Sequence, residues 1–174
     1  MSDITKQSLS ELVKNIKNKK VSSEEITKEF VNRSEKSKEL NAYITEDYSS
    51  ALDKAKKFDQ KPNLDLKLPG IPIAVKDLFC TKDIRTTAGS KILNNFVPTY
   101  ESTVTQNIWN EGAILLGKLN CDEFAMGSSN ETSFFGNVQN PINKNLVPGG
   151  SSGGSASAVA GQLTPITIGT DTGG

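Results

Sequence analysis

The feature that most constrains this chain is a glycine- and serine-rich segment near its end, residues 147–157. The segment reads Val-Pro-Gly-Gly-Ser-Ser-Gly-Gly-Ser-Ala-Ser, and eight of the chain's 14 glycines lie between residues 147 and 174. Glycine is used where the backbone must take unusual angles or approach a ligand closely, at an entropic cost on folding. The interleaved serines add hydroxyls to the free backbone N–H groups. Such a loop is typical of an acyl-transfer site or an anion-binding site.

Composition excludes several functional classes. The 20 basic and 20 acidic residues balance, so no electrostatic footprint for nucleic acid is visible. Histidine is absent, which rules out a Ser–His–Asp triad and a histidine metal site within these residues, and no metal is expected. Cys80 and Cys121 have no metal or redox spacing and are interpreted as reduced, structural thiols. No signal peptide or membrane-length apolar run occurs, so a cytoplasmic protein is expected.

The first part of the chain is predicted to be helical. Capping boxes at Ser8-x-x-Glu11 and Ser22-x-x-Glu25 predict a helix over 8–20 and the start of a second one. The apolar side chains of the second helix that should point inward are Ile26, Phe30 and Val31. A short extended piece over 40–45 and a third helix at about 48–58 follow, and then a polar loop over 59–67.

The remainder is predicted to be an α/β unit. Apolar runs over 71–75, 113–117 and 165–169 indicate buried strands, and helices are expected over 102–112 and 155–161. Buried strands separated by helices favour an α/β sheet that is covered on both faces. The predicted division is a helical segment over about 1–67 and the start of an α/β core over about 68–174.

The last predicted strand leads into Thr170-Asp-Thr-Gly-Gly174, where the sequence stops. In α/β folds the residues just past the carboxyl end of a strand usually build the site. We therefore expect an N-terminal part of a longer protein, truncated before the fold is complete.

Two familiar loop chemistries fit the glycine–serine segment poorly. The spacing of Gly149 and Gly154 matches a phosphate-binding loop, but Ser155 and Ala156 replace the required Lys and Ser/Thr. A nucleophile elbow, G-x-S-x-G, can be centred on Ser151 or Ser152, but Pro148 is unsuited to the strand that should precede it.

A third chemistry uses a lysine as the base. Free lysine has a pKa near ~10.4 and becomes a base at neutral pH only where burial lowers that value. Lys76 follows the apolar run Ile-Pro-Ile-Ala-Val and precedes Leu-Phe, which makes it the best-placed lysine for this role. The alternative is an ordinary surface lysine at a strand end.

Together these motifs resemble the amidase signature family. Residues 149–160 and 169–174 resemble its signature, and 72–77 resembles the segment that carries its catalytic lysine. Further segments are similar to the A subunit of the glutamyl-tRNA(Gln)/aspartyl-tRNA(Asn) amidotransferases rather than to fatty-amide or indoleacetamide hydrolases; they are 87–94, 123–133, Gly136 and Asn140-Pro141. The resemblance implies one amidase-signature domain with a mixed sheet core flanked by helices.

The resemblance also implies a Ser–cis-Ser–Lys site. Lys76 would be the neutral base, and Ser151, after a cis peptide from Gly150, would relay the proton. The acylating serine of the family would directly follow Gly174. The implied oxyanion-binding residues are Thr172, Gly173 and Gly174, with Asp171 as a hydrogen-bonding strut. The implied glutamine-pocket residues are Gly127, Ser128 and Ser129.

The implied activity is that of a glutaminase subunit of a tRNA-dependent amidotransferase, an enzyme of the ligase class. It would release ammonia from glutamine, and B and C subunits would be its partners. The B subunit would hold the mischarged tRNA and use ATP with Mg²⁺, so this chain needs no cofactor of its own. The 174 residues alone are predicted to be inactive. Two alternatives stay open: an amidase that acts on free small amides, and a non-enzymatic anion-binding module.

Overall fold

The centre of the molecule is a mixed four-stranded sheet with the strand order β1-β3-β2-β4. The structure is a computed structural model, and it describes residues 3–171. The strands are β1 (Tyr43–Glu46), β2 (Pro72–Lys76), β3 (Ile114–Leu119) and β4 (Thr167–Ile168). β2 runs parallel to both β3 and β4, whereas β1 is antiparallel to β3. The predicted mixed sheet is thereby confirmed.

The two central strands account for the strongest apolar runs of the sequence. Every residue of β2 and β3 is buried, as the continuous apolar character of 71–75 and 113–117 predicts. The third strand is shorter than predicted. Of residues 165–169 only Thr167 and Ile168 form a strand, and both are half-buried. Within the described residues β4 pairs on one side only, with β2, so its other side has no strand to cover it.

The helices begin where the capping residues predict. α1 (Leu9–Lys17) and α2 (Ser23–Glu35) both have complete capping boxes, at Ser8 and Ser22. α2 buries Ile26, Phe30 and Val31 as expected. α3 (Tyr48–Gln60) and α4 (Thr103–Asn110) also lie where the sequence predicts them. α5 (Gly153–Ala160) starts two residues before the predicted Ser155, so the glycine pair belongs to its first turn.

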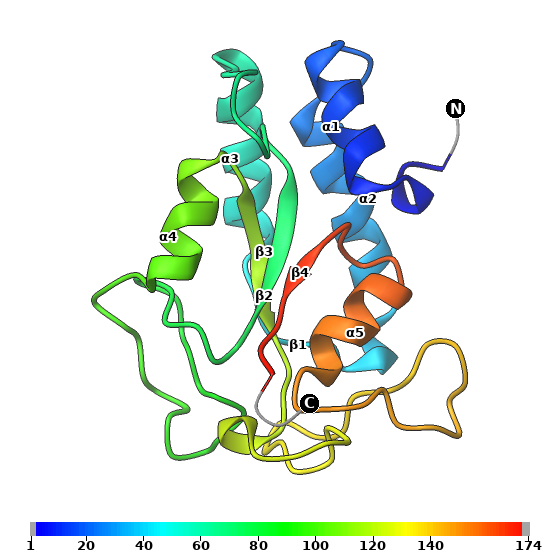
Figure 1. The fold of residues 1–174 in the computed structure, drawn as a ribbon, viewed down its shortest axis with the longest axis vertical. Helices are drawn as coiled ribbons and strands as arrows, with labels where there is room; N and C mark the ends of the chain where they lie inside the picture. The colour runs from blue at the N-terminus through cyan, green and yellow to red at the C-terminus, as the bar shows by residue number, and fades with distance from the viewer. Residues whose placement is uncertain (1–2, 172–174) are drawn as a thin grey trace.

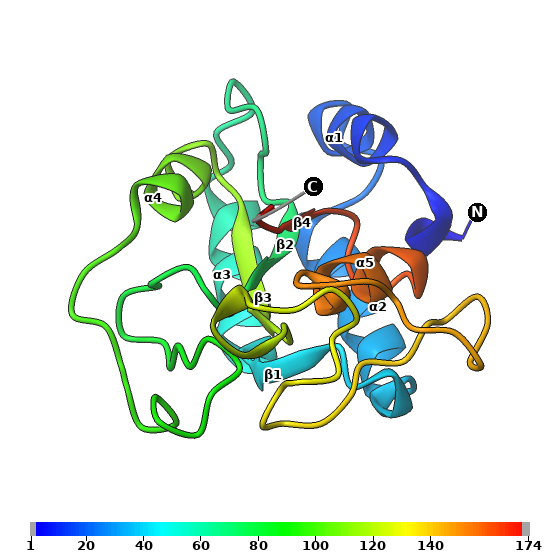
Figure 2. The same cartoon turned by 60° about the horizontal axis from the view of Figure 1, so that its bottom comes forward.

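The helices cover both sides of the sheet. α4 lies on one side, and α2 and α5 lie on the other, with the strands between them (Figures 1 and 2). α3 packs against α2 and β3. One continuous apolar core joins these elements, with Leu12, Ile26, Phe30, Ile73 and Leu116 among its most buried members. None of the helices over residues 3–171 is long and apolar enough to cross a bilayer.

The predicted helical segment is not separate from the sheet. Its extended piece forms β1, and Tyr43, Thr45 and Glu46 pair with Leu119, Lys118 and Gly117 of β3. The first 67 residues therefore supply an edge strand to the core, and the division at about residue 67 stays a prediction.

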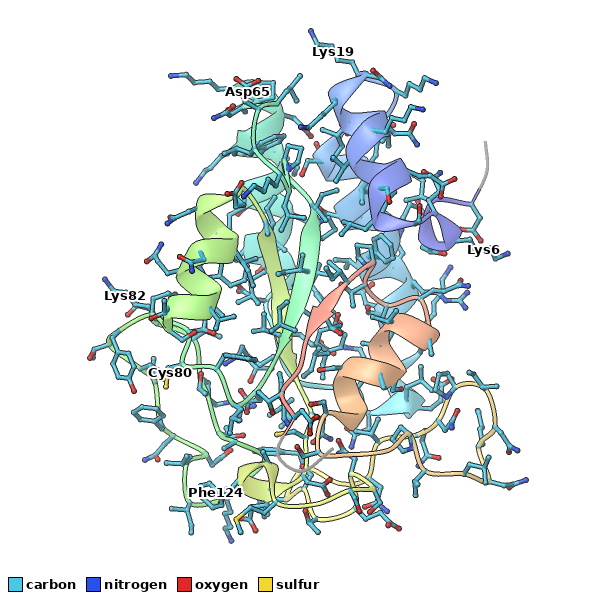
Figure 3. The ribbon with its side chains drawn as sticks, viewed as in Figure 1. Lys6, Lys19, Asp65, Cys80, Lys82 and Phe124 are labelled. Atoms are coloured by element: carbon cyan, nitrogen blue, oxygen red, sulfur yellow. The ribbon has the colours of Figure 1, made fainter. Side chains whose placement is uncertain are left out.

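Both cysteines are free thiols, as predicted, but only one is structural in the expected sense. Cys121 is buried just after β3. Cys80 is half-exposed, with its Sγ 3.3 Å from the Tyr100 hydroxyl, and Figure 3 shows it at the edge of the molecule.

Parallel pairing decides where a site can form. β2, β3 and β4 end at the same edge of the sheet, at Lys76, Leu119 and Ile168. The long connections over 77–102 and 120–152 gather at this end of the molecule, at the bottom of Figure 1, and Figure 2 brings it forward. Polar residues placed just after these strands therefore converge.

Candidate active site

Lys76 is the centre of the site. It is the last residue of β2, and its side chain is fully buried. Its Nζ lies 2.6 Å from Ser151 Oγ, 3.0 Å from Ser152 Oγ and 2.8 Å from Thr170 Oγ1. The three hydroxyls come from the glycine–serine loop and from the residues after β4. The interpretation of Lys76 as an ordinary surface lysine is therefore wrong.

The surroundings of Lys76 favour a neutral amine. Burial lowers the pKa of Lys76, and at neutral pH the negative charge of Asp122 opposes this shift. Burial also raises the pKa of the Cys121 thiol to about 12, so this thiol is uncharged at neutral pH. The partners of Lys76 also suit a neutral amine, which can donate to two hydroxyls and accept from a third.

The carboxylate next to Lys76 in sequence is paired elsewhere. Asp77 and Lys118 form an ion pair at 3.3 Å, and both side chains are completely buried. Thr87 donates its N–H, at 2.8 Å, and its hydroxyl, at 2.5 Å, to the other oxygen of Asp77. The Lys118 ammonium also donates to the Thr86 hydroxyl and the Phe79 carbonyl. Because Lys118 balances the charge of Asp77, the Asp77 carboxylate does not need a protonated Lys76 as its partner.

The glycine–serine loop carries the predicted cis peptide. The bond between Gly150 and Ser151 is cis. Position 150 has no room for a side chain, since a Cβ there would lie 2.2 Å from Asp122 Oδ2 and 2.6 Å from the Ser129 nitrogen. The Ser151 carbonyl accepts the Asp122 N–H at 3.2 Å. The loop is thus held in place by the residues that follow β3.

The contacts of two side chains with Lys76, those of Ser152 and Thr170, were not predicted. Ser152 donates its hydroxyl to the Thr170 carbonyl at 2.8 Å and accepts the Thr170 N–H at 3.0 Å. Thr170 in turn contacts Lys76. Both residues lie inside the motifs that carry the family resemblance, which was the available signal. Their role depends on a contact between segments 18 residues apart, and residue spacing alone does not show that contact.

The predicted glutamine-pocket residues lie beside the cis peptide. Gly127 and Ser128 are exposed and Ser129 is half-buried, in the loop that follows the 3₁₀ turn Glu123–Ala125. The backbone of 128–129 packs directly against Gly150. Ser128 and Ser129 therefore lie beside the residue that precedes Ser151, Gly127 packs on Asp122, and contact of the three residues with a substrate stays a prediction.

The predicted oxyanion-binding residues Thr172, Gly173 and Gly174 lie outside the described residues. Thr170, two positions before them, is hydrogen-bonded to Ser152 and Lys76. The strut role of Asp171 stays a prediction.

The structure contradicts the interpretation of the loop as a nucleophile elbow. An elbow needs a strand before the serine and a helix after it. Residues 136–152 contain no strand, although α5 does begin at Gly153. The serines of this loop are therefore presented to Lys76 by a coil and not by a strand-to-helix turn.

Comparisons with known proteins identify the family of this chain. The chain is 83% identical over its whole length to the A subunit of glutamyl-tRNA(Gln) amidotransferase from Pelagibacter ubique and covers 36% of that protein. It is 52% identical to the A subunit of the same enzyme from Rickettsia bellii, of which it covers 37%. It thus spans little more than a third of the length of these curated relatives.

A solved structure shows the same fold. The A subunit of glutamyl-tRNA(Gln) amidotransferase from Thermotoga maritima matches 97% of this chain with a TM-score of 0.77 and 32% identity, over 35% of its own length. The family model described as Amidase matches residues 25–174, which include Lys76, the cis peptide and Thr170. The chain belongs to the amidase family.

Proposed function

We propose that the whole protein is the glutaminase subunit of a tRNA-dependent amidotransferase. The observation that carries this proposal is the contact of the buried Lys76 amine with Ser151, the residue that follows the cis Gly150–Ser151 peptide bond. The relatives named as A subunits of glutamyl-tRNA(Gln) amidotransferase support the choice of an amidotransferase subunit, and glutamine as the substrate follows from the family resemblance.

The chemistry follows from a neutral lysine. Lys76 accepts the Ser151 proton, and Ser151 takes the proton of the acylating serine that the family resemblance places directly after Gly174. That serine attacks the side-chain amide carbon of glutamine and forms a tetrahedral intermediate, whose oxyanion the backbone N–H groups of 172–174 would bind. The relayed proton returns to the leaving nitrogen, so ammonia departs and a γ-glutamyl ester remains. Water then hydrolyses the ester to glutamate and frees the serine.

The ammonia would serve a second polypeptide of the complex. In this proposal the B subunit uses ATP and Mg²⁺ to activate the mischarged Glu-tRNA(Gln), or Asp-tRNA(Asn), and ammonia converts the activated ester to the amide. A C subunit completes a cytoplasmic heterotrimer. The described residues of this chain would contribute Lys76 and Ser151 to the amide-cleaving half of the reaction.

The test measures ammonia release from glutamine by the whole protein, with and without its partner subunits. We expect glutamine hydrolysis that rises when the partners, ATP and mischarged tRNA are present. Simple free amides serve as the comparison substrates. Faster hydrolysis of those amides than of glutamine, without any effect of the partners, would replace the proposal with a free-amide amidase.

A matched assay uses the 174-residue polypeptide by itself. We predict no ammonia release from glutamine, because the acylating serine that the resemblance implies is not among these residues. Turnover by the pure polypeptide would show that one of its own serines is the nucleophile.

A further inference from the structure

We propose that Asp122 is a positioning residue that holds the predicted amide pocket and the cis Gly150–Ser151 peptide in one geometry. Asp122 lies three residues beyond the end of β3 and is completely buried. The proposal rests on the proposed function for the identity of the substrate, and on the contacts below for everything else.

The Asp122 carboxylate organises the loop that contains the predicted pocket. Its Oδ2 accepts the Asn130 N–H at 2.9 Å. Its Oδ1 accepts the Thr132 N–H at 3.2 Å and the Thr132 hydroxyl at 2.8 Å. Residues 127–132 therefore wrap around one carboxylate, as a loop wraps around an ion.

The same carboxylate is packed between two glycines. A Cβ at Gly127 would lie 2.3 Å from Asp122 Cγ, and a Cβ at Gly150 would lie 2.2 Å from Asp122 Oδ2. Real Cβ atoms do not approach so closely, so both positions require glycine while Asp122 keeps this conformation. Gly127 opens the predicted pocket, and Gly150 precedes the predicted proton relay, Ser151.

The backbone of Asp122 adds a direct link to the relay. Its N–H donates to the Ser151 carbonyl at 3.2 Å. One residue thus touches the pocket loop through its side chain and the cis peptide through both its side chain and its backbone. A shift of Asp122 would therefore move both the loop over residues 127–132 and Ser151 relative to Lys76.

The hydrogen bonds explain why an aspartate is needed. Each carboxylate oxygen accepts a backbone N–H, one from Asn130 and one from Thr132. An asparagine has nearly the same shape, but in either orientation its NH₂ group would face one of these N–H groups. Loss of one such bond to a charged acceptor, with the donor left buried, corresponds to a change of about 10- to 100-fold in an equilibrium.

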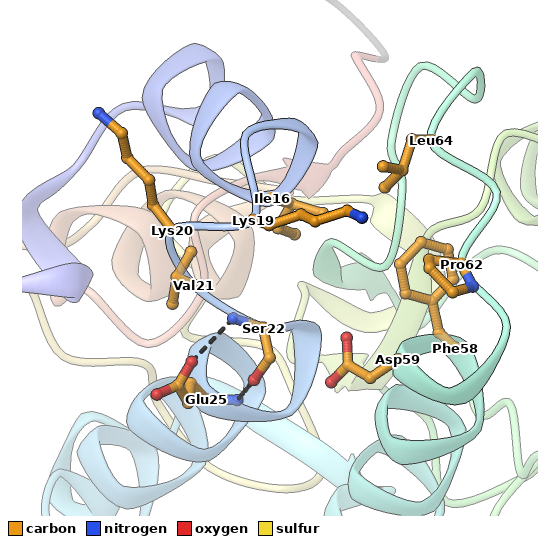
Figure 4. Close-up of a pocket in the computed structure, with 10 residues that line it drawn as sticks. All are labelled: Ile16, Lys19, Lys20, Val21, Ser22, Glu25, Phe58, Asp59, Pro62 and Leu64. Atoms are coloured by element: carbon orange, nitrogen blue, oxygen red, sulfur yellow. Dashed lines mark hydrogen bonds between the residues drawn. The ribbon is translucent and has the colours of Figure 1, made fainter.

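The molecule contains a control for this substitution at Asp59, an aspartate that is half-buried and lies away from the site. Asp59 accepts the backbone N–H groups of Ser23 and Glu24, each at 2.9 Å, so it holds a helix start with two bonds of the same kind. Figure 4 shows Asp59 beside a cavity of about 410 Å³ near Ser22 and Phe58. The Ser23 hydroxyl donates to the Gly70 carbonyl, just before β2 starts. Asp59 therefore lies at the opposite end of β2 from Lys76.

The experiment compares Asp122→Asn with Asp59→Asn in the whole protein with its partner subunits. For Asp122→Asn we expect kcat/KM for glutamine to fall about 10- to 100-fold, with KM raised and kcat lowered, because both halves of the site move. For Asp59→Asn we expect a lower Tm but kcat and KM within about 2-fold of wild type.

The pH profile gives a readout that a merely structural role would not change. The charged and titratable groups around Lys76 are Asp122, the neutral Cys121 thiol and the Asp77–Lys118 ion pair, and Asp122→Asn removes only the first. Because the Asp122 charge favours protonated Lys76, the acidic limb of kcat should move to lower pH in Asp122→Asn. It should not move in Asp59→Asn.

A milder variant covers the case in which Asp122→Asn does not fold. Thr132→Val removes the hydroxyl bond at 2.8 Å and leaves the Asp122 charge and both backbone bonds in place. We expect KM to rise several-fold while the pH profile stays unchanged. An unchanged KM in Thr132→Val, or Asp122→Asn kinetics that match those of Asp59→Asn, would overturn the proposal.

The design separates this proposal from the proposed function. If the wild-type protein hydrolyses free amides but no glutamine, the proposed function is wrong. The Asp122 variants are then measured with the amide that is hydrolysed. A loss of kcat/KM on that substrate, with the shifted acidic limb, would still support the positioning role.

Discussion

The Lys76 amine nitrogen lies 2.6 Å from the Ser151 hydroxyl oxygen, although the two residues are 75 positions apart in the chain. β2 brings the lysine to the carboxyl edge of the sheet, and the coil before α5 brings the serine. Ser152 and Thr170 complete the ring of hydroxyls around the amine. A fully buried amine with hydroxyl partners is equipped to exchange protons with them.

Lys76→Ala should reduce glutamine turnover by about 10²- to 10⁴-fold, the usual contribution of a general base. The fold should survive, because alanine leaves no buried charge without a partner. Steady-state ammonia release and thermal unfolding check both parts. A variant that keeps its turnover within a few-fold of wild type would make Lys76 a structural residue.

Ser151→Ala and Ser152→Ala should lower kcat by different amounts. Ser151→Ala removes the predicted relay and should lower kcat by at least about 100-fold. Ser152→Ala removes the bonds that tie Thr170 to the loop and should lower kcat less, because the path from Lys76 through Ser151 remains. Single-turnover acylation rates of the two variants provide the comparison. Equal losses would contradict a relay through Ser151 alone.

The lowered pKa of Lys76 predicts two effects of pH. Activity should rise as pH increases through the folded-state pKa of Lys76, because only the neutral amine accepts a proton. The unfolded chain binds the Lys76 proton more tightly than the folded chain does. The free energy of unfolding of wild type, relative to that of Lys76→Met, should therefore increase with pH between the folded-state pKa and ~10.4. Urea unfolding of both proteins across this range measures the slope, and parallel curves would show that the pKa is not lowered.

Lys118→Met should be strongly destabilising, by about 3–5 kcal/mol, because it leaves the buried Asp77 carboxylate without its cation. The double variant Lys118→Met/Asp77→Asn removes both charges and should be more stable than the single variant. Equilibrium unfolding of the two variants and of wild type gives the coupling. If the double variant is the less stable of the two, the pair does not act as a compensated buried ion pair.

The local elements and the family could be predicted from the sequence. The capping boxes at Ser8 and Ser22 determine where α1 and α2 begin, since each uses residues only three positions apart. The apolar runs predict β2 and β3 because both strands are buried on both faces. The motifs around Lys76 and Ser151 indicate a lysine-dependent amidase site through their resemblance to one family.

The tertiary structure decided what depends on distant contacts. Pairing of β1 with β3 brought the predicted helical segment into the sheet, and the pairing of β4 with β2 is limited to two residues. The approach of Ser152 and Thr170 to Lys76, and the packing of Gly127 and Gly150 on Asp122, join segments that no local pattern relates. Spacing along a chain determines backbone geometry over a few residues, whereas the partners of a buried charge are chosen by how whole elements pack.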